Sequence, residues 1–335
     1  MAMSTSTFNE SDVLRQKAGQ PTGGQFAEKV KASSGLSLAP EPVSAEPVES
    51  ADELLDVVQR SLTDYRQDGL HGGPHYLQTV SQHLGGMEAE RFEEDFFVPM
   101  VVALDEGDRE EALRHAERAM VVAERERRWR EHPTFTEPTF DVVAEDPIYG
   151  DRVQGSKYDP DKTLPEIGKA LRADIKEAVE AGYLPEGLDY RVRTDSRGTS
   201  TIRVTAHGMP NEDYYVPGRI FGEPEALTSA QAQLLDERLE TLAEAYTVQQ
   251  SNSQVDYWNH TAHVSSRVYS ASEVRQTKAW NEIDKAVARH RKARRDGDHE
   301  AAGQAAGDRV RAQQEYRQAV ADHEALMKGI RARAE

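Results

Sequence analysis

The fold is decided by residues 163–206, which read TLPEIGKALRADIKEAVEAGYLPEGLDYRVRTDSRGTSTIRVTA. The first part predicts a helix, because Thr163 and Glu166 have the spacing of a capping box and Pro165 falls in the first turn, where its missing N–H costs nothing. The apolar residues of this helix recur every four positions and would form one face: Ile167, Leu171, Ile175 and Val179. Gly182 is placed to end the helix, since glycine adopts the left-handed C-cap conformation without strain.

The second part of the same stretch predicts a β-hairpin. Residues 190–195 and 200–206 alternate apolar and polar side chains, as a strand with one buried side requires. The segment 196–199 between them contains a glycine and supplies the turn. The alternation directs three apolar side chains to the core, namely Val192, Ile202 and Val204. It leaves four arginines on the exposed side and at the tip of the hairpin: Arg191, Arg193, Arg197 and Arg203.

These arginines are one of two candidate surfaces for binding nucleic acid, because a two-stranded ribbon can enter a major groove. The second is a predicted helix over residues 278–295, with seven Lys or Arg and two Asp or Glu. Its densest basic cluster comprises Arg289, Arg291, Lys292, Arg294 and Arg295. An ordinary solvated sheet face and an ordinary charged helix would explain the same patterns. The formal net charge of −18 also opposes broad attraction to phosphates.

Composition and periodicity predict an α+β fold that is predominantly helical. We divide the chain into a disordered tail with a Pro-rich linker, a helical bundle, an irregular connection, an α+β accessory domain and a helical hairpin or coiled-coil arm, over residues 1–51, 52–132, 133–162, 163–270 and 271–335 respectively. The tail lacks apolar periodicity and cannot offset its ordering entropy by burial. The two terminal helices offer a surface for oligomerisation.

Further elements are expected inside these segments. In the bundle, helices are predicted over 74–84, 89–104 and 108–131. The connection contains a β-like run at 140–143, which is typical of an irregular edge strand. In the accessory domain we expect a third strand at 214–216, a helix over 228–246 capped by Thr228, and a last strand at 263–269.

Several kinds of catalytic and membrane function find no support in the sequence. The chain has no cysteine, so it has no disulfide, thiolate nucleophile or Cys-based zinc site, which fits a reducing cytosol. Its longest uncharged apolar run, at 96–104, is too short to span a bilayer. There is no phosphate-binding loop and no nucleophile elbow. We therefore name no catalytic residue and no cofactor, and we expect no membrane association and a cytoplasmic location in a bacterial host.

Histidine is the only residue type of note as a metal ligand or general base, because carboxylates are too abundant here to be informative. His71 and His75 are four positions apart, but two glycines lie between them, so a helical pair is not indicated. His260 and His263 precede or enter a strand. Because protein zinc sites need three or four ligands of matching geometry, these pairs predict no metal site.

Two parts of the chain resemble proteins of phages and mobile elements. Residues 15–26, RQKAGQPTGGQF, resemble a short tag near the N-termini of many actinobacterial phage and mobile-element proteins. Residues 163–217 together with 243–269 resemble the twenty-ninth domain of the large polyvalent-protein-associated series. That resemblance is carried by the motifs 167–172, 190–193, 200–204, 208–210, 245–246, 251–253 and 256–258. It implies a phage or mobile-element accessory protein and no catalytic residues.

The leading hypothesis is a non-enzymatic accessory protein of an actinobacterial phage or integrated element. It would bind a host or phage protein or a nucleic acid, the latter through the hairpin or the basic helix. The alternative is a virion-associated or assembly protein that docks through its tail and terminal helices. An enzyme ranks third, since the sequence has no recognisable nucleophile, metal set or cofactor loop.

Overall fold

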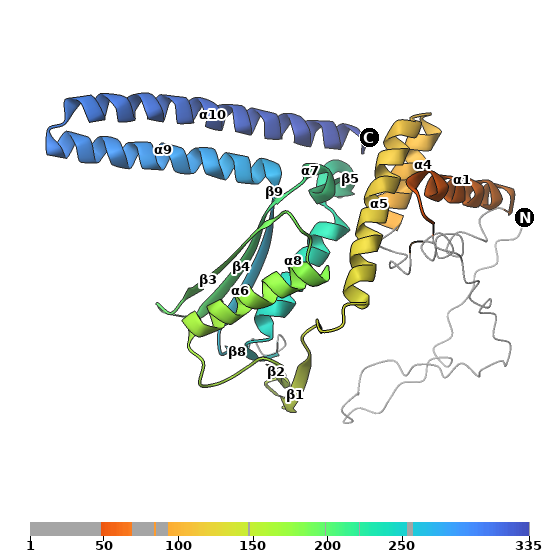
Figure 1. Ribbon diagram of the computed structural model, residues 1–335, viewed down its shortest axis with the longest axis horizontal. Helices are drawn as coiled ribbons and strands as arrows, with labels where there is room; N and C mark the ends of the chain where they lie inside the picture. Colours follow the sequence, from red (N-terminus) through yellow and green to blue (C-terminus); the bar gives the residue numbers. More distant parts are fainter. Residues whose placement is uncertain are drawn as a thin grey trace, which may run out of the picture. The chain divides into compact units, whose positions relative to one another are not determined.

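The computed structural model describes residues 48–68, 84, 93–146, 148–197, 199–220, 222–252 and 257–334. Within them the predicted α+β, predominantly helical fold is confirmed (Figure 1). The expected disordered tail, the tag at 15–26, the pair His71 and His75, and nearly all of the helix predicted over 74–84 lie outside the described residues.

The predicted helical bundle is present as helices that share one core. It contains α1 (Ala51–Asp68), the short π-helix η2 (Glu93–Phe97), α4 (Val98–Asp105) and α5 (Arg109–Arg130). Its largest fully buried side chains are Leu54, Leu55, Phe96 and Met100. The continuous α-helix expected over 89–104 is wrong at 93–97. Pro99 follows this turn, and because it lacks an N–H it cannot close the regular bond to residue 95.

The central domain places two helices on one side of a three-stranded sheet. Its parts are α6 (Leu164–Ala181), β3 (Asp189–Asp195), β4 (Thr201–Met209), α8 (Ala230–Glu244) and β9 (His263–Ser270). The strand order is β3-β4-β9, with β3 antiparallel and β9 parallel to β4. In Figure 1, α6 crosses in front of β3 and β4. Both helices share one core with the sheet, which includes Leu171, Ile175, Ile202, Val204, Leu239 and Leu242.

The helix ends in this domain largely follow the sequence signals. The capping box of α6 is formed by Thr163 and Glu166, and the hydrogen bond from the Thr163 hydroxyl lowers the pKa of Glu166. Gly182 ends the helix at φ 87°. The expected cap of α8 was wrong by one residue, because Thr228 is held in a strand pair. Ser229 is the N-cap instead, and its hydroxyl accepts from the N–H of Ala232.

The third strand of the central sheet is not the one expected from the sequence. The prediction placed it at 214–216, but this run belongs to α7 (Asn211–Tyr214) and β5 (Tyr215–Ile220). β5 pairs with β6 (Glu223–Thr228) in a separate two-stranded sheet. α7 follows Pro210 directly and turns the chain away from β4 before a strand can pair with it. The strand predicted at 263–269 takes the third position as β9.

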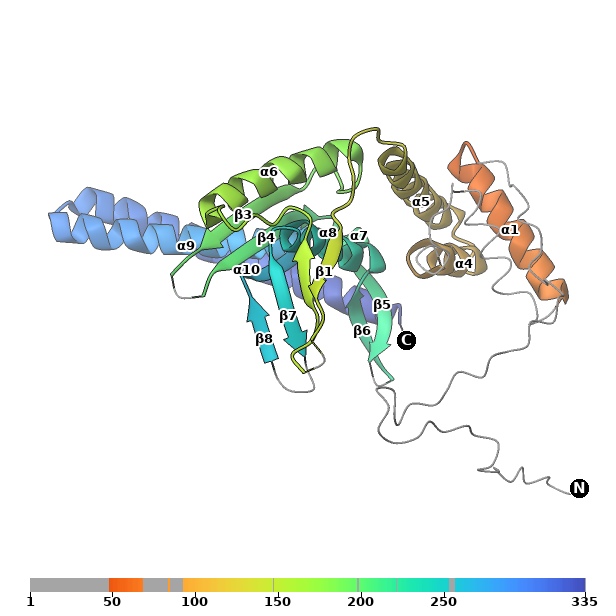
Figure 2. The ribbon, with the colours of Figure 1, turned by 90° about the horizontal axis from the view of Figure 1, so that it is seen from below.

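The segment 133–162 is more regular than expected. It contributes β1 (Phe140–Ala144) and β2 (Arg152–Gly155) to a four-stranded antiparallel sheet that is completed by β7 (Val248–Asn252) and β8 (Tyr257–His260). Figure 2 shows β7, β8 and β1 close together. All five residues of β1 are exposed, so this strand lacks the alternation that predicts a buried face. Its position at the edge of the sheet agrees with the edge strand considered at 140–143.

The predicted helical hairpin is formed by α9 (Ala271–Asp296) and α10 (His299–Ala332), which run side by side (Figure 1). The buried residues recur at steps of three, four, seven and eleven, each of which returns to the same side of a helix. They are mostly alanine: Ala279, Ile283, Ala286 and Ala293 on α9, and Ala302, Ala305, Ala312, Ala319 and Ile330 on α10. This is the periodicity of a coiled coil with small side chains in the seam. Ion pairs such as Arg289 with Asp308 join the two helices at their edges.

We expect Gly303→Ala to stabilise this hairpin. A Cβ at position 303 of α10 would meet no atom within 4 Å, and the backbone there is helical. Alanine is favoured over glycine inside a helix by about 0.5–1 kcal/mol. The midpoint of thermal unfolding, followed by circular dichroism, should rise accordingly. A lower midpoint would contradict the open space around position 303.

Candidate binding surface on the open face of the central sheet

The side of the central sheet opposite α6 and α8 carries a concentration of polar, charged and aromatic side chains. We call this side the open face and define it by the strand register. Its residues lie in four rows across β3, β4 and β9: Asp195–Thr201–His263, Arg193–Arg203–Ser265, Arg191–Thr205–Arg267 and Asp189–His207–Tyr269. Paired residues project to the same side of a sheet, and alternate residues of a strand project to opposite sides.

The prediction that the hairpin arginines share one face is confirmed. Val192, Ile202 and Val204 are buried, and the three arginines Arg191, Arg193 and Arg203 are exposed. Arg197 lies between the two strands with its side chain 91% exposed and forms an ion pair with Asp195. The arginines that the sequence assigns to the exposed side of the hairpin therefore lie on one face of the sheet.

Arg193 and Arg203 stand directly opposite each other on neighbouring strands. Among the described residues, neither side chain makes an ion pair or a hydrogen bond. The other arginines of the hairpin and sheet are partnered, Arg191 by Asp189 and Arg267 by Glu273. Like charges facing each other across two strands lower stability. An anion between the two guanidinium groups would remove this repulsion.

The next two rows carry a stacked aromatic group. The rings of His207 and Tyr269 are 4.7 Å apart between centroids and inclined by only 13°. The guanidinium of Arg267 lies 4.6 Å from the centre of the Tyr269 ring. His207 Nε2 is 2.9 Å from the Thr205 hydroxyl. Burial lowers the pKa of His207, and the nearby Arg191 lowers it further, which favours the neutral imidazole.

Sequence reasoning missed Arg267, His207 and Tyr269 as members of this surface. Each lies in a predicted strand or directly after one, so the alternation of Arg267 and Tyr269 with Val268 was a usable signal. What the sequence did not reveal was that β9 pairs in parallel with β4 and so brings these residues beside the hairpin. Parallel pairing depends on the α8 crossover and leaves no local pattern.

The second candidate, the basic helix, lies on α9 where it approaches α10. Arg289 is bound by Asp308 of α10. The rest of the cluster is exposed: Arg291, Lys292, Arg294 and Arg295. The turn that follows adds the carboxylates of Asp296 and Asp298, of which the latter caps α10. Acidic groups therefore accompany this cluster, and no aromatic pair lies among its residues.

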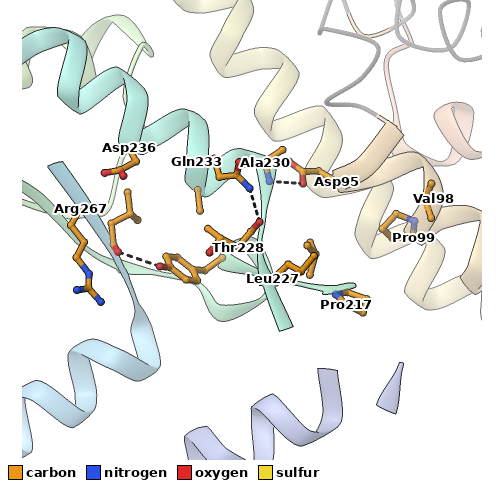
Figure 3. Close-up of a pocket in the computed structure, with 14 residues that line it drawn as sticks. Asp95, Val98, Pro99, Pro217, Leu227, Thr228, Ala230, Gln233, Asp236 and Arg267 are labelled. Atoms are coloured by element: carbon orange, nitrogen blue, oxygen red, sulfur yellow. Dashed lines mark hydrogen bonds between the residues drawn. The ribbon is translucent and has the colours of Figure 1, made fainter. Parts of the chain in front are cut away.

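A cavity of about 780 Å³ lies beside the free edge of β9 (Figure 3). The carboxylate of Asp95 lines it and accepts from the N–H groups of Ala230 and Gln231 at the start of α8, at 3.2 and 3.0 Å. The Gln233 amide donates to the Thr228 carbonyl. These hydrogen bonds join η2 to the start of α8. Asp236 also lines the cavity, and one of its carboxylate oxygens is buried without a hydrogen-bond partner among the described residues.

Two further observations concern the described part of the chain alone. It holds no group of three or more His, Asp and Glu side chains placed to bind a metal ion. His260 ends β8 and His263 begins β9. No helix in the described ranges is both long and apolar enough to cross a membrane.

The open face is thus the surface on which unpartnered cations and stacked rings occur together. Its geometry suits an anionic ligand that also has flat apolar groups. Comparison with known proteins adds no assignment: no protein-family model, no curated protein and no solved structure matches this chain.

Proposed function

We propose that this protein is a non-enzymatic accessory protein that binds nucleic acid through the open face of its central sheet. The observation that carries the proposal is the unpartnered pair of Arg193 and Arg203, opposite each other in the middle of that face. Guanidinium groups match the geometry of phosphate oxygens and form two parallel hydrogen bonds with them. A phosphate bound between these two side chains converts a repulsive contact into a favourable one.

The acidic composition of the whole chain is compatible with this proposal. At physiological ionic strength, charges more than about 8 Å apart in solvent are largely screened from each other. A phosphate on the open face is therefore governed by the groups within that distance. Five arginines belong to the hairpin and the sheet, and three of them have a carboxylate partner, namely Asp189, Asp195 or Glu273. The excess of cations is local, whereas the net charge of −18 belongs to the whole chain.

The biological setting that we propose rests on the two sequence resemblances described above. The tag at 15–26 and the motifs of residues 163–269 support the proposal of an actinobacterial phage or mobile-element protein that acts in the cytoplasm of the bacterial host.

We expect the double variant Arg193→Gln with Arg203→Gln to bind an oligonucleotide at least about tenfold more weakly, since each lost guanidinium removes charge-assisted hydrogen bonds. The slope of log affinity against log salt concentration should fall by about 1.4 for a single strand and about 1.8 for a duplex. Fluorescence anisotropy with a labelled oligonucleotide measures both. The urea midpoint of the variant should be unchanged or higher, because a like-charge pair has been removed.

The matched control is Arg291→Gln with Arg294→Gln on α9, which removes the same two positive charges from the other candidate surface. We expect this control to keep the affinity of the unmodified protein. Equal losses in both double variants would mean that only net charge matters. Unchanged affinity in the sheet variant, or no binding by the unmodified protein, would refute the proposal.

A further inference from the structure

The chemistry of the open face goes beyond attraction to phosphates. Besides the two unpartnered arginines it presents the stack of Arg267, Tyr269 and His207, whose members come from two strands. The rings are only partly buried, and the lowered pKa of His207 favours its neutral form. A neutral flat ring stacks on a nucleic-acid base, whereas bases inside a duplex are already stacked on their neighbours.

Building on the proposed function, we infer that the ligand of the open face is single-stranded nucleic acid. An unpaired base extends the stack that Arg267, Tyr269 and His207 form, while neighbouring phosphates lie at Arg193 and Arg203. The two features are separated by one row of the sheet, the row of Arg191, Thr205 and Arg267. Rows on one face are two residues apart, which places the stack about 13 Å from the arginine pair. A short stretch of extended strand can therefore contact both.

The shape of the surface agrees with an unpaired strand. The face is built on three neighbouring strands, and β3 has seven residues, so it is about 20 Å long. A single strand laid along this surface can present its bases to the rings in succession. A duplex would present phosphates to the arginines but no exposed base to the rings. We therefore expect the strand to be bound more tightly than the duplex.

The discriminating experiment compares three labelled ligands with the full chain, by fluorescence anisotropy at fixed salt. They are a DNA strand of about 12 nucleotides, the duplex of the same sequence, and an abasic strand of the same length. The abasic strand keeps the phosphates and lacks the bases. We expect the normal strand to bind about tenfold more tightly than the abasic one, since one stacked base contributes an amount of this order. A separate measurement with the RNA strand of the same sequence shows whether single-stranded DNA or single-stranded RNA is the preferred ligand.

Tyr269→Ala should weaken binding of the normal strand about tenfold and leave the abasic strand unaffected. Tyr269→Phe keeps the ring and should restore binding, which separates stacking from any effect on folding. A duplex bound as tightly as the strand, or a Tyr269→Ala loss that is equal for normal and abasic strands, would overturn the inference. In those cases nucleic-acid binding itself stands. If none of the ligands binds, the proposed function fails as well.

Discussion

Arg238→Ala is expected to lower the free energy of unfolding by about 3–5 kcal/mol, the usual cost of removing one member of a buried ion pair. Arg238 lies on α8 and makes two parallel hydrogen bonds to Glu126 of α5, at 2.9 and 2.8 Å. The two side chains are only 7% and 5% exposed. Removal of the guanidinium would leave the buried Glu126 carboxylate facing the more distant guanidinium of Arg125, 3.8 Å away.

The surroundings of this ion pair enlarge the expected loss. The Arg238 guanidinium also donates to the backbone carbonyl of Tyr183 at 2.7 Å. It lies 4.7 Å from the centres of both the Trp129 and the Tyr183 rings. The contact therefore joins α5 of the helical bundle to the core of the central domain, through an ion pair, a backbone bond and two aromatic rings. Truncation to alanine removes all three and opens a cavity.

Urea unfolding followed by tryptophan fluorescence and by circular dichroism measures this effect. The control is the double variant Arg238→Met with Glu126→Leu, which replaces the ion pair with apolar side chains of similar volume. Such replacements are often neutral or stabilising, so part of the lost free energy should return. Recovery is incomplete because Glu126→Leu also removes the carboxylate 3.8 Å from the Arg125 guanidinium. A loss below about 1 kcal/mol in Arg238→Ala, typical of an exposed pair, would contradict the buried geometry. So would a double variant as unstable as the single one.

The position of Arg238 was open to prediction from its spacing, although its partner was not. Arg238 lies three residues after Leu235 and four before Leu242, on the face of α8 that packs into the core. Charged residues are almost never fully buried unless paired, so an arginine is assigned to solvent by default. Glu126 is 112 residues away in the sequence. No local pattern reports a contact of that range.

The hairpin shows the opposite case, in which local patterns suffice. Its alternation fixes which side of β3 and β4 is buried, since a shift of one residue would expose Val192 and Val204 together. The sequence alone could therefore assign Arg191, Arg193 and Arg203 to the open face. Its aromatic part could not, because Tyr269 reaches it through the parallel pairing of β9. Local periodicity thus predicted the elements, and contacts between distant segments completed the surface.

Gly155→Ala is expected to lower the free energy of unfolding by about 3 kcal/mol, at the upper end of the usual cost of overpacking. Gly155 ends β2, where the chain passes the end of α8. A Cβ at this position would lie 2.4 Å from the carbonyl oxygen of Ala245 and 2.5 Å from its Cα. These are backbone atoms, so no side-chain rotation can relieve the collision. The strand would have to move away from β7.

That movement would break backbone hydrogen bonds at the same place. The N–H of Gly155 donates to the Thr247 carbonyl at 3.0 Å, and the N–H of Lys157 donates to the Ala245 carbonyl at 2.9 Å. The φ of Gly155 does not lie in the left-handed region, so the loss arises from the collision alone. Gly303→Ala is the matched control, with the same added methyl group and no neighbour within 4 Å.

Urea unfolding of the two alanine variants under identical conditions separates the effect of close approach from that of glycine itself. Hydrogen exchange should show lost protection in β1, β2 and β7 for Gly155→Ala, and unchanged protection in the central sheet. Equal stability of the two variants would mean that β2 does not pass against α8 at this distance. A loss confined to Gly155→Ala would establish that the segment 133–162, irregular by its sequence, is held to the central domain by a backbone contact that admits no side chain.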